Sequence, residues 1–148
     1  MKQETTDYLK KEMGSVHDAF QTLDKYNPKL AEAVVSLRKL TVSGGHDTES
    51  ALAPKYKELI MVAIEVATGR GEKGKTHAQK AIRAGATPDE VLDALGLCIY
   101  LVGMSSWVDG GHACLIAAVD EMKKMKQGKD FQWGSSAPRE QKATSRKS

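Results

Sequence analysis

The sequence predicts an all-α protein of about six packed helices. Apolar residues recur at spacings of three and four along most of the 148-residue chain, which is the pattern of helices that bury one face. Three of these segments begin with a proline. The first helical position tolerates proline because its N–H would have no helical partner anyway. No segment alternates apolar and polar residues in the way that a half-buried strand does.

Two helices are expected before a polar loop. The first covers residues 15–26, where apolar side chains share one face. The second follows Asn27 and Pro28 and continues to about Thr41. Asn27 is a favourable N-cap and Pro28 suits the first helical position. Residues 43–50 are polar and include two adjacent glycines, so we expect a loop there.

Four more helices are expected after this loop, at residues 54–68, about 72–85, 88–102 and about 105–126. The third of them has the clearest start signal. Its sequence Thr-Pro-Asp-Glu at 87–90 is typical of a capping box with a proline in the first turn. The last helix carries a patch of small residues that predicts a close helix–helix contact: Gly110, Gly111, Ala113, Ala117 and Ala118.

The net charge is concentrated at the C-terminal end. Lys and Arg number 22 against 19 Asp and Glu, a formal net charge of +3. Residues 134–148 carry four basic side chains and one acidic one, so the first 133 residues hold 18 of each sign. A neutral body argues against a nucleic-acid-binding domain, whose basic surface belongs on its folded part. We expect one domain at residues 1–127 and a disordered basic tail at 128–148.

Composition sets further limits. Hydrophobic residues make up 41% of the chain but aromatic ones only 5%, which predicts an aliphatic core. Cys98 and Cys114 are too few for a disulfide framework or a structural zinc site, and we expect no metal. The N-terminal residues do not resemble a secretory signal, and the aliphatic runs fall far short of the roughly 20 residues that cross a bilayer. We therefore expect a cytoplasmic protein without a membrane partner.

Residues 69–76, Gly-Arg-Gly-Glu-Lys-Gly-Lys-Thr, satisfy the phosphate-loop pattern G-x-x-x-x-G-K-[ST]. Such a loop needs a strand feeding its glycine turn, within a parallel sheet that has further strands. The preceding run Leu59–Val66 could pass as a strand by itself, but the chain offers no others and Pro54 starts a helix better. We interpret the motif as a chance match. Nucleotide binding is an alternative that would require ATP affinity abolished by Lys75→Ala.

Four segments between residues 52 and 104 carry a family pattern: Leu52–Gly69, His77, Ala84–Leu95 and Ile99–Met104. They resemble the carboxymuconolactone decarboxylase family, which also contains the alkylhydroperoxidase D proteins. The resemblance extends over about residues 15–125. It implies an alkylhydroperoxidase D-like fold of packed helices that assembles as homotrimers or homohexamers.

This family divides by its chemistry. The peroxidase branch carries Cys-x-x-Cys-x-x-x-His with a glutamate one helix earlier, and the corresponding residues here are Arg70, Lys73, His77 and Glu58. Peroxide reduction needs a nucleophilic and a resolving thiol, so the resemblance implies that this activity is absent. The decarboxylase branch fits better, because four residues look like its arginine, glutamate, lysine and histidine: Arg70, Glu72, Lys75 and His77.

The resemblance implies a cofactor-independent lyase that acts on a small carboxylated or lactone substrate. Loss of CO₂ needs no organic cofactor if the substrate's own conjugated carbonyl accepts the electrons. We expect His77 to be the general acid near neutral pH, assisted by Glu72 and Glu58. Arg70 is the expected clamp for the departing carboxylate, because its guanidinium is always charged and bidentate.

Lys75, Glu65 and His46 complete the expected substrate site. Glu65 lies among apolar residues, which is unusual for a carboxylate with a purely structural role, and seven residues after Glu58. His46 lies in the polar loop that stands where the decarboxylases have a Trp-containing loop, so the particular lactone is open. Glu72 and Lys75 could equally form a solvated pair on one helix.

Two other functions stay open at this point. One is an antioxidant, peroxiredoxin-type protein that uses Cys98 and Cys114 as atypical thiols. The other is a non-catalytic oligomeric member of the same family.

Overall fold

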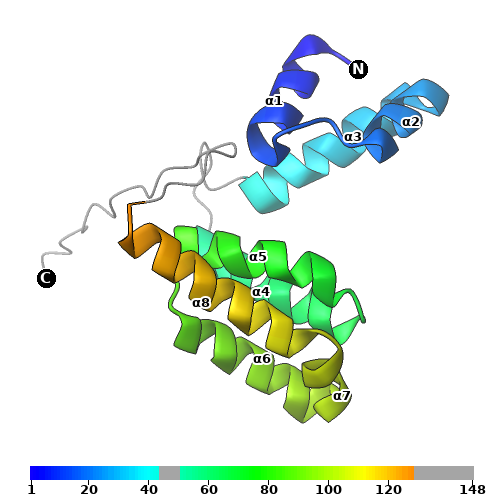
Figure 1. Cartoon of the computed structure of the whole chain (residues 1–148). Helices are drawn as coiled ribbons and strands as arrows, with labels where there is room; N and C mark the ends of the chain where they lie inside the picture. The colour runs from blue at the N-terminus through cyan, green and yellow to red at the C-terminus, as the bar shows by residue number, and fades with distance from the viewer. Residues whose placement is uncertain (44–50, 129–148) are drawn as a thin grey trace, which may run out of the picture.

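The computed structural model describes residues 1–43 and 51–128, and within these ranges all regular secondary structure is helical. The predicted fold class is therefore confirmed (Figure 1). The loop containing His46 and the predicted tail beyond Gly128 lie outside the described residues. Within the described part, no helix is both long and apolar enough to cross a membrane.

Residues 54–128 form a body of four long helices: α4 (Pro54–Ala67), α5 (Gly71–Arg83), α6 (Pro88–Val102) and α8 (His112–Lys126). A short connection of α7 (Met104–Ser106) and the wide π-helical turn η2 (Trp107–Gly111) joins α6 to α8. Figure 1 shows α5 packed between α4 and α8, with α6 along the opposite side. We refer to residues 54–128 as the four-helix body.

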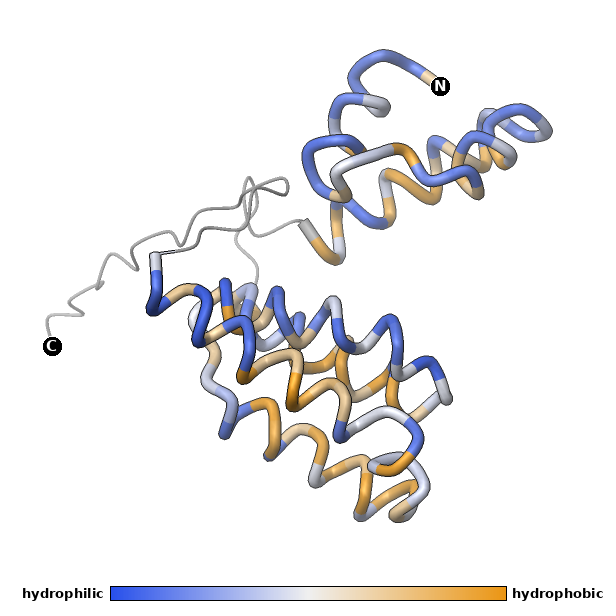
Figure 2. Tube along the Cα trace, in the orientation of Figure 1, coloured by the Kyte–Doolittle hydropathy of each residue, from blue (hydrophilic) through white to orange (hydrophobic). Residues whose placement is uncertain are grey.

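The core of this body is aliphatic, as its composition predicts. Figure 2 shows hydrophobic residues concentrated on α4 and α6, whereas α5 is more hydrophilic. The buried residues of α5 are nevertheless all small or apolar. The buried side chains come from all four long helices and the turn before α6: Leu59, Val62, Val66, Ala78, Ala81, Ile82, Ala86, Val91, Leu95, Cys98, Cys114 and Ala118.

Two glycines bring α5 into backbone contact with η2. A Cβ placed on Gly71 would lie 2.5 Å from the Cα of Gly110, and the reverse distance is 2.7 Å. The predicted small-residue contact is therefore present, with Gly110 at its centre. One turn later, a Cβ on Gly74 would lie 2.9 Å from the sulfur of Cys114. These contacts fix the first turn of α5 against the start of α8.

The capping box at the start of α6 is confirmed. Thr87 Oγ1 accepts a hydrogen bond from the Glu90 N–H at 3.2 Å, and Glu90 Oε2 accepts one from the Thr87 N–H at 2.9 Å. Lys55 at the start of α4 donates a further hydrogen bond of 2.8 Å to Glu90. These contacts lower the pKa of the Glu90 carboxyl, the Lys55 hydrogen bond being the largest cause.

Three helices precede the body: α1 (Gln3–Met13), α2 (Asp18–Tyr26) and α3 (Pro28–Arg38), which continues into the π-helical turn η1 (Lys39–Ser43). The cap and proline predicted for α3 are confirmed, since Asn27 Oδ1 accepts from the Leu30 N–H at 3.1 Å. Helix α1 was not among the expected helices. Its sequence has few apolar residues, and its only buried side chains are Thr5 and Leu9.

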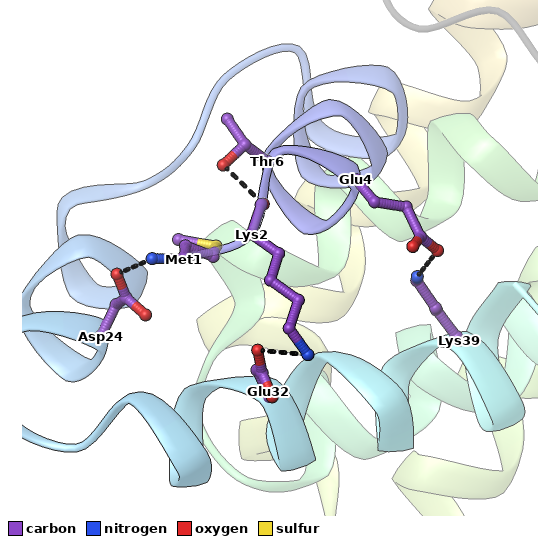
Figure 3. A network of polar contacts seen from close by, with 7 residues as sticks. All are labelled: Met1, Lys2, Glu4, Thr6, Asp24, Glu32 and Lys39. Carbon is purple, nitrogen blue, oxygen red and sulfur yellow. Dashed lines mark hydrogen bonds and ion pairs between the residues drawn. The ribbon is translucent and has the colours of Figure 1, made fainter.

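Ion pairs join the first four residues of the chain to α2, α3 and η1. Figure 3 shows the amino group of Met1 at Asp24, Lys2 at Glu32 and Lys39 at Glu4. The apolar contact beneath them is small, with Ala31 and Val35 as the buried residues of α3. The remaining apolar stripe of α3 and η1 is exposed: Leu30, Val34, Leu37 and Leu40. We refer to residues 1–43 as the N-terminal helices.

Candidate functional site

The central feature of the candidate site is a contact between a glutamate and a histidine. The Nδ1 of His77 lies 2.8 Å from Oε2 of Glu58, and the two side chains are 19% and 14% exposed. A carboxylate can only accept a hydrogen bond, so Nδ1–H donates to it. The other ring nitrogen, Nε2, is then the atom that can exchange a proton with a substrate.

The helix packing explains why these two side chains meet. Leu59 and Val62 bury one face of α4, and Ala78 and Ala81 bury one face of α5. Glu58 and His77 each precede a buried residue, so they lie at the edge of the packed faces where α4 and α5 meet the surface. The core therefore holds the pair in register while leaving both side chains partly accessible.

A second ion pair lies on the same side of α4 and α5. Arg70 Nε lies 2.8 Å from Oε2 of Glu65, an ionic contact rather than an aligned hydrogen bond. Arg70 also donates to Thr68 Oγ1 at 3.2 Å. Because Glu65 follows Glu58 by two helical turns, the two pairs are separated by roughly 10 Å along α4.

Arg70 and Glu65 differ in accessibility, with Arg70 51% exposed and Glu65 16% exposed. The structure thus brings together Glu58 with His77 and Glu65 with Arg70. The positive charge of Arg70, the predicted carboxylate clamp, is already matched by a carboxylate of the chain itself.

Glu72 and Lys75 contact one another rather than His77. They form an ion pair three residues apart on α5, in which Glu72 is 84% exposed. Five residues separate Glu72 from His77, which places them about 140° apart around an α-helix. This arrangement matches the solvated pair that the sequence left as an alternative. The structure does not describe His46.

Both cysteines lie in the core of the body. Cys114 Sγ is buried against Gly74 and donates to the carbonyl of Gly71 at 3.4 Å. Burial raises the pKa of the Cys114 thiol to about 11 and also raises the pKa of Cys98. A thiol that stays protonated and buried is a poor nucleophile, so neither cysteine has the environment that a peroxidase needs.

Lys80 is a charged residue near the Glu58–His77 pair. The sequence did not predict it as a site residue. It lies one turn after His77 on α5 and is only partly exposed. Burial is the main cause that lowers its pKa. Glu58 and Glu12 act to raise that pKa, whereas Arg38 and Arg83 act to lower it. The charges of Arg38 on α3 and of Glu12 on α1 therefore both act on the amine of Lys80.

The signals for these additional residues differ. Lys80 has the spacing of three from His77 that places two side chains on one helix side, so the sequence contained a signal for it. Arg38 belongs to α3, and no local pattern connects it with α5. In the described ranges, no group of three or more His, Cys, Asp and Glu side chains is arranged to hold a metal ion.

Two comparisons with known proteins indicate the same family, and a third finds an uncharacterized relative. The family model for the carboxymuconolactone decarboxylase family matches residues 28–114. An uncharacterized protein of Methanocaldococcus jannaschii, MJ1511, is 26% identical over 104 residues, which cover 70% of this chain and 92% of that protein. The crystal structure of a candidate carboxymuconolactone decarboxylase from Burkholderia xenovorans is similar with a TM-score of 0.71 and 26% identity, covering 86% of this chain and 95% of that one.

Proposed function

The chain belongs to the carboxymuconolactone decarboxylase family, and on this premise we propose that it is a cofactor-independent lyase for a small carboxylated or lactone substrate. The observation that supports this proposal most directly is the partly buried contact of 2.8 Å between Glu58 and His77. A histidine oriented by a carboxylate is suited to proton transfer near neutral pH.

The proposed reaction removes CO₂ and then adds a proton to carbon. The electron pair of the broken C–CO₂ bond moves into the conjugated carbonyl of the substrate. His77, protonated on both nitrogens, gives its Nε2 proton to the carbon and becomes neutral. Glu58 keeps the Nδ1–H bond throughout, so it fixes the ring orientation and stabilises the charged imidazolium. Arg70 lies two turns before His77, at the N-terminal end of α5, and is paired with Glu65, so its role as the carboxylate clamp stays a prediction.

A mutational assay tests this assignment. Candidate substrates are small acids and lactones whose carboxylate is β to a carbonyl or at the vinylogous position, so that the electron pair of the broken bond can form an enolate, and the assay follows CO₂ release. We expect His77→Gln to lower kcat by roughly 10²-fold or more, the usual contribution of a positioned acid or base. Glu58→Gln keeps the side-chain size and should lower kcat less while changing its pH profile. Wild-type turnover in His77→Gln would refute the proposed site.

Matched controls separate this lyase from the alternative functions. His112→Gln changes an exposed histidine on α8 and should leave turnover unchanged. Replacement of Cys98 and Cys114 by serine should also leave it unchanged. Peroxide turnover that disappears in the serine variants would favour the antioxidant function instead. A chain without turnover on any such acid would favour a non-catalytic family member. Roles for Glu72 and Lys75 stay predictions, as does a cytoplasmic location.

We further propose that the protein assembles as a homotrimer or homohexamer through α6 and α7. From Ala94 to Val108 the sequence contains no charged residue. Several large apolar side chains of this segment are nevertheless exposed in the single chain: Leu97, Tyr100, Leu101, Val102, Met104 and Val108. A contiguous exposed apolar surface of this kind marks an interaction site. We call these six residues the α6 apolar band.

The mass of the protein in solution tests this assembly. Light scattering coupled to size exclusion should give three or six chains for the wild type. Leu101→Glu places a charge in the α6 apolar band and should dissociate the assembly. Leu37→Glu changes a similarly exposed leucine on α3 and serves as the control. A monomeric wild type would contradict the proposal.

A further inference from the structure

One of the six methionines of the chain is far more exposed than the others. Met104, the first residue of α7, is 62% exposed in the single chain. The remaining methionines are all partly buried: Met1, Met13, Met61, Met122 and Met125. An oxidant dissolved in water must reach the sulfur atom before it can react with it. Met104 is therefore the methionine that such an oxidant reaches most easily.

The turn that carries Met104 is fixed by its backbone. Gly103 has a φ of +108°, a conformation that favours glycine. The hydroxyl of the buried Ser106 donates to the Gly103 carbonyl at 2.8 Å, and the Trp107 N–H donates to the Met104 carbonyl. These contacts hold the turn in one conformation, with the Met104 side chain on its outer surface.

Met104 is also a member of the α6 apolar band. Tyr100 and Leu101 precede it at the end of α6, and Val108 follows it in η2 (Figure 1). A thioether is apolar and packs well in such a band. Its sulfoxide is polar and accepts hydrogen bonds. The six side chains of the band offer one donor, the Tyr100 hydroxyl, so a sulfoxide does not suit this surface.

From this placement we propose that Met104 is a site of oxidation by hydrogen peroxide, and that its sulfoxide separates the associated chains. The inference rests on the proposed assembly through the α6 apolar band. In the reaction the sulfur lone pair attacks one peroxide oxygen. An S–O bond forms, the O–O bond breaks, and the second oxygen leaves as water after a proton moves to it. The sulfur loses two electrons and the peroxide gains them.

The effect on the assembly follows from linkage. Association covers the band, so the dissociated chain is the form that reacts with peroxide. Once the sulfoxide has formed, covering the band again would bury a polar oxygen that lacks a donor, which costs free energy. Oxidised chains therefore associate more weakly, and peroxide shifts the population toward separate chains.

Peroxide treatment of the full-length wild type tests this inference. The reaction is stopped with catalase at increasing times, and each sample is divided between peptide mass spectrometry and light scattering coupled to size exclusion. We expect Met104 sulfoxide to accumulate before that of any other methionine, and more slowly at higher protein concentration. The mass should fall as it accumulates, with association weakened about 10-fold or more. The two methionine sulfoxide reductases, one for each epimer, should restore the mass.

Substitutions at Met104 separate its role from general oxidative damage. Met104→Leu removes the sulfur but keeps an apolar side chain, so it should assemble and keep its mass under peroxide. Met104→Gln introduces a polar side chain and should weaken association without any peroxide. Met13→Leu changes a partly buried methionine of α1 and should lose mass under peroxide as the wild type does. Circular dichroism first establishes that each variant is folded. The test on Met104→Leu does not depend on the glutamine variant.

Three results would overturn the inference: oxidation of another methionine before Met104, an unchanged mass when Met104 is fully oxidised, or an equal loss of mass in Met104→Leu and the wild type. These outcomes differ from failure of the proposed assembly. A wild type that is monomeric before peroxide is added would contradict that assembly and this inference with it. An assembled wild type that keeps its mass with oxidised Met104 would remove this inference alone.

Discussion

The N-terminal helices and the four-helix body are both helical, but they are stabilised in different ways. In the body, buried aliphatic side chains from four helices form a continuous core. The N-terminal helices bury only Thr5, Leu9, Ala31 and Val35, and α2 buries none. Their connecting ion pairs are mostly exposed, and such pairs contribute little free energy. The comparison indicates that the body can hold its structure largely by itself, whereas the N-terminal helices are marginal.

The Glu58–His77 pair belongs to the four-helix body. Glu58 and His77 come from α4 and α5, whose inner faces form the centre of the core. The position of the proposed acid should therefore be rigid.

A cavity in the body should have the largest effect on stability. Leu95 on α6 is 1% exposed and lies at the centre of the core. We expect Leu95→Ala to lower the free energy of unfolding by about 2–5 kcal/mol, the range for a buried leucine. Denaturant unfolding monitored by circular dichroism measures this loss. A loss below about 1 kcal/mol would mean that the core is less well packed than the burial suggests.

Overpacking the glycine contact should have the next largest effect. Gly71→Ala would place a methyl group 2.5 Å from the Cα of Gly110, which the two backbones can relieve only by moving apart. We expect a destabilisation of about 1–3 kcal/mol. Gly96→Ala is the control, because a Cβ there meets nothing within 4 Å and alanine favours a helix. Equal stability of Gly71→Ala and the wild type would contradict the close contact.

The same leucine truncation in the N-terminal helices should have a smaller and local effect. Leu9 is completely buried, but it does not belong to the core of the four-helix body. We expect Leu9→Ala to increase hydrogen exchange of the amides in α1 and α3 and to leave those of α4 and α5 protected. If the amides of the four-helix body also lost their protection from exchange, the two regions would unfold as one cooperative unit. That result would contradict the difference in stability between them.

The smallest effect concerns the reactivity of a buried thiol. The pKa of Cys114 is raised to about 11, so at pH 8 only about 10⁻³ of the thiol is ionised. Labelling of the folded protein with a thiol reagent should be very slow at pH 8 and should accelerate about tenfold per pH unit below pH 11. Urea-unfolded protein is the control and should react at once. Rapid labelling at pH 8 in the folded state would show that Cys114 is exposed by local opening.

The sequence predicted the helices of the body well because their ends carry strong local signals. Pro54, the capping box at Thr87 and the helical spacing of apolar residues all depend on near neighbours in the chain. Helix α1 was missed because a single buried leucine and a buried threonine make no recognisable apolar face. The ion pairs that join this end of the chain to Asp24, Glu32 and Lys39 are distant in the sequence, so no local pattern indicates them.

The candidate site was predictable to a similar extent. The family pattern pointed to Glu58 and His77, which the structure places 2.8 Å apart. It also pointed to Arg70 but gave no indication that Glu65 would match its charge. Arg38 lies 42 residues before Lys80 in the sequence, so no local pattern indicated that its charge would act on the Lys80 amine.

The α6 apolar band has a consequence for every stability measurement on this protein. If the band is covered only when chains associate, folding is coupled to association by mass action. The unfolding midpoint should then rise with the logarithm of protein concentration, and dilution should favour dissociated chains with an exposed apolar helix. Leu101→Glu should remove this concentration dependence. The stability of the fold would then be a property that the chains in an assembly share.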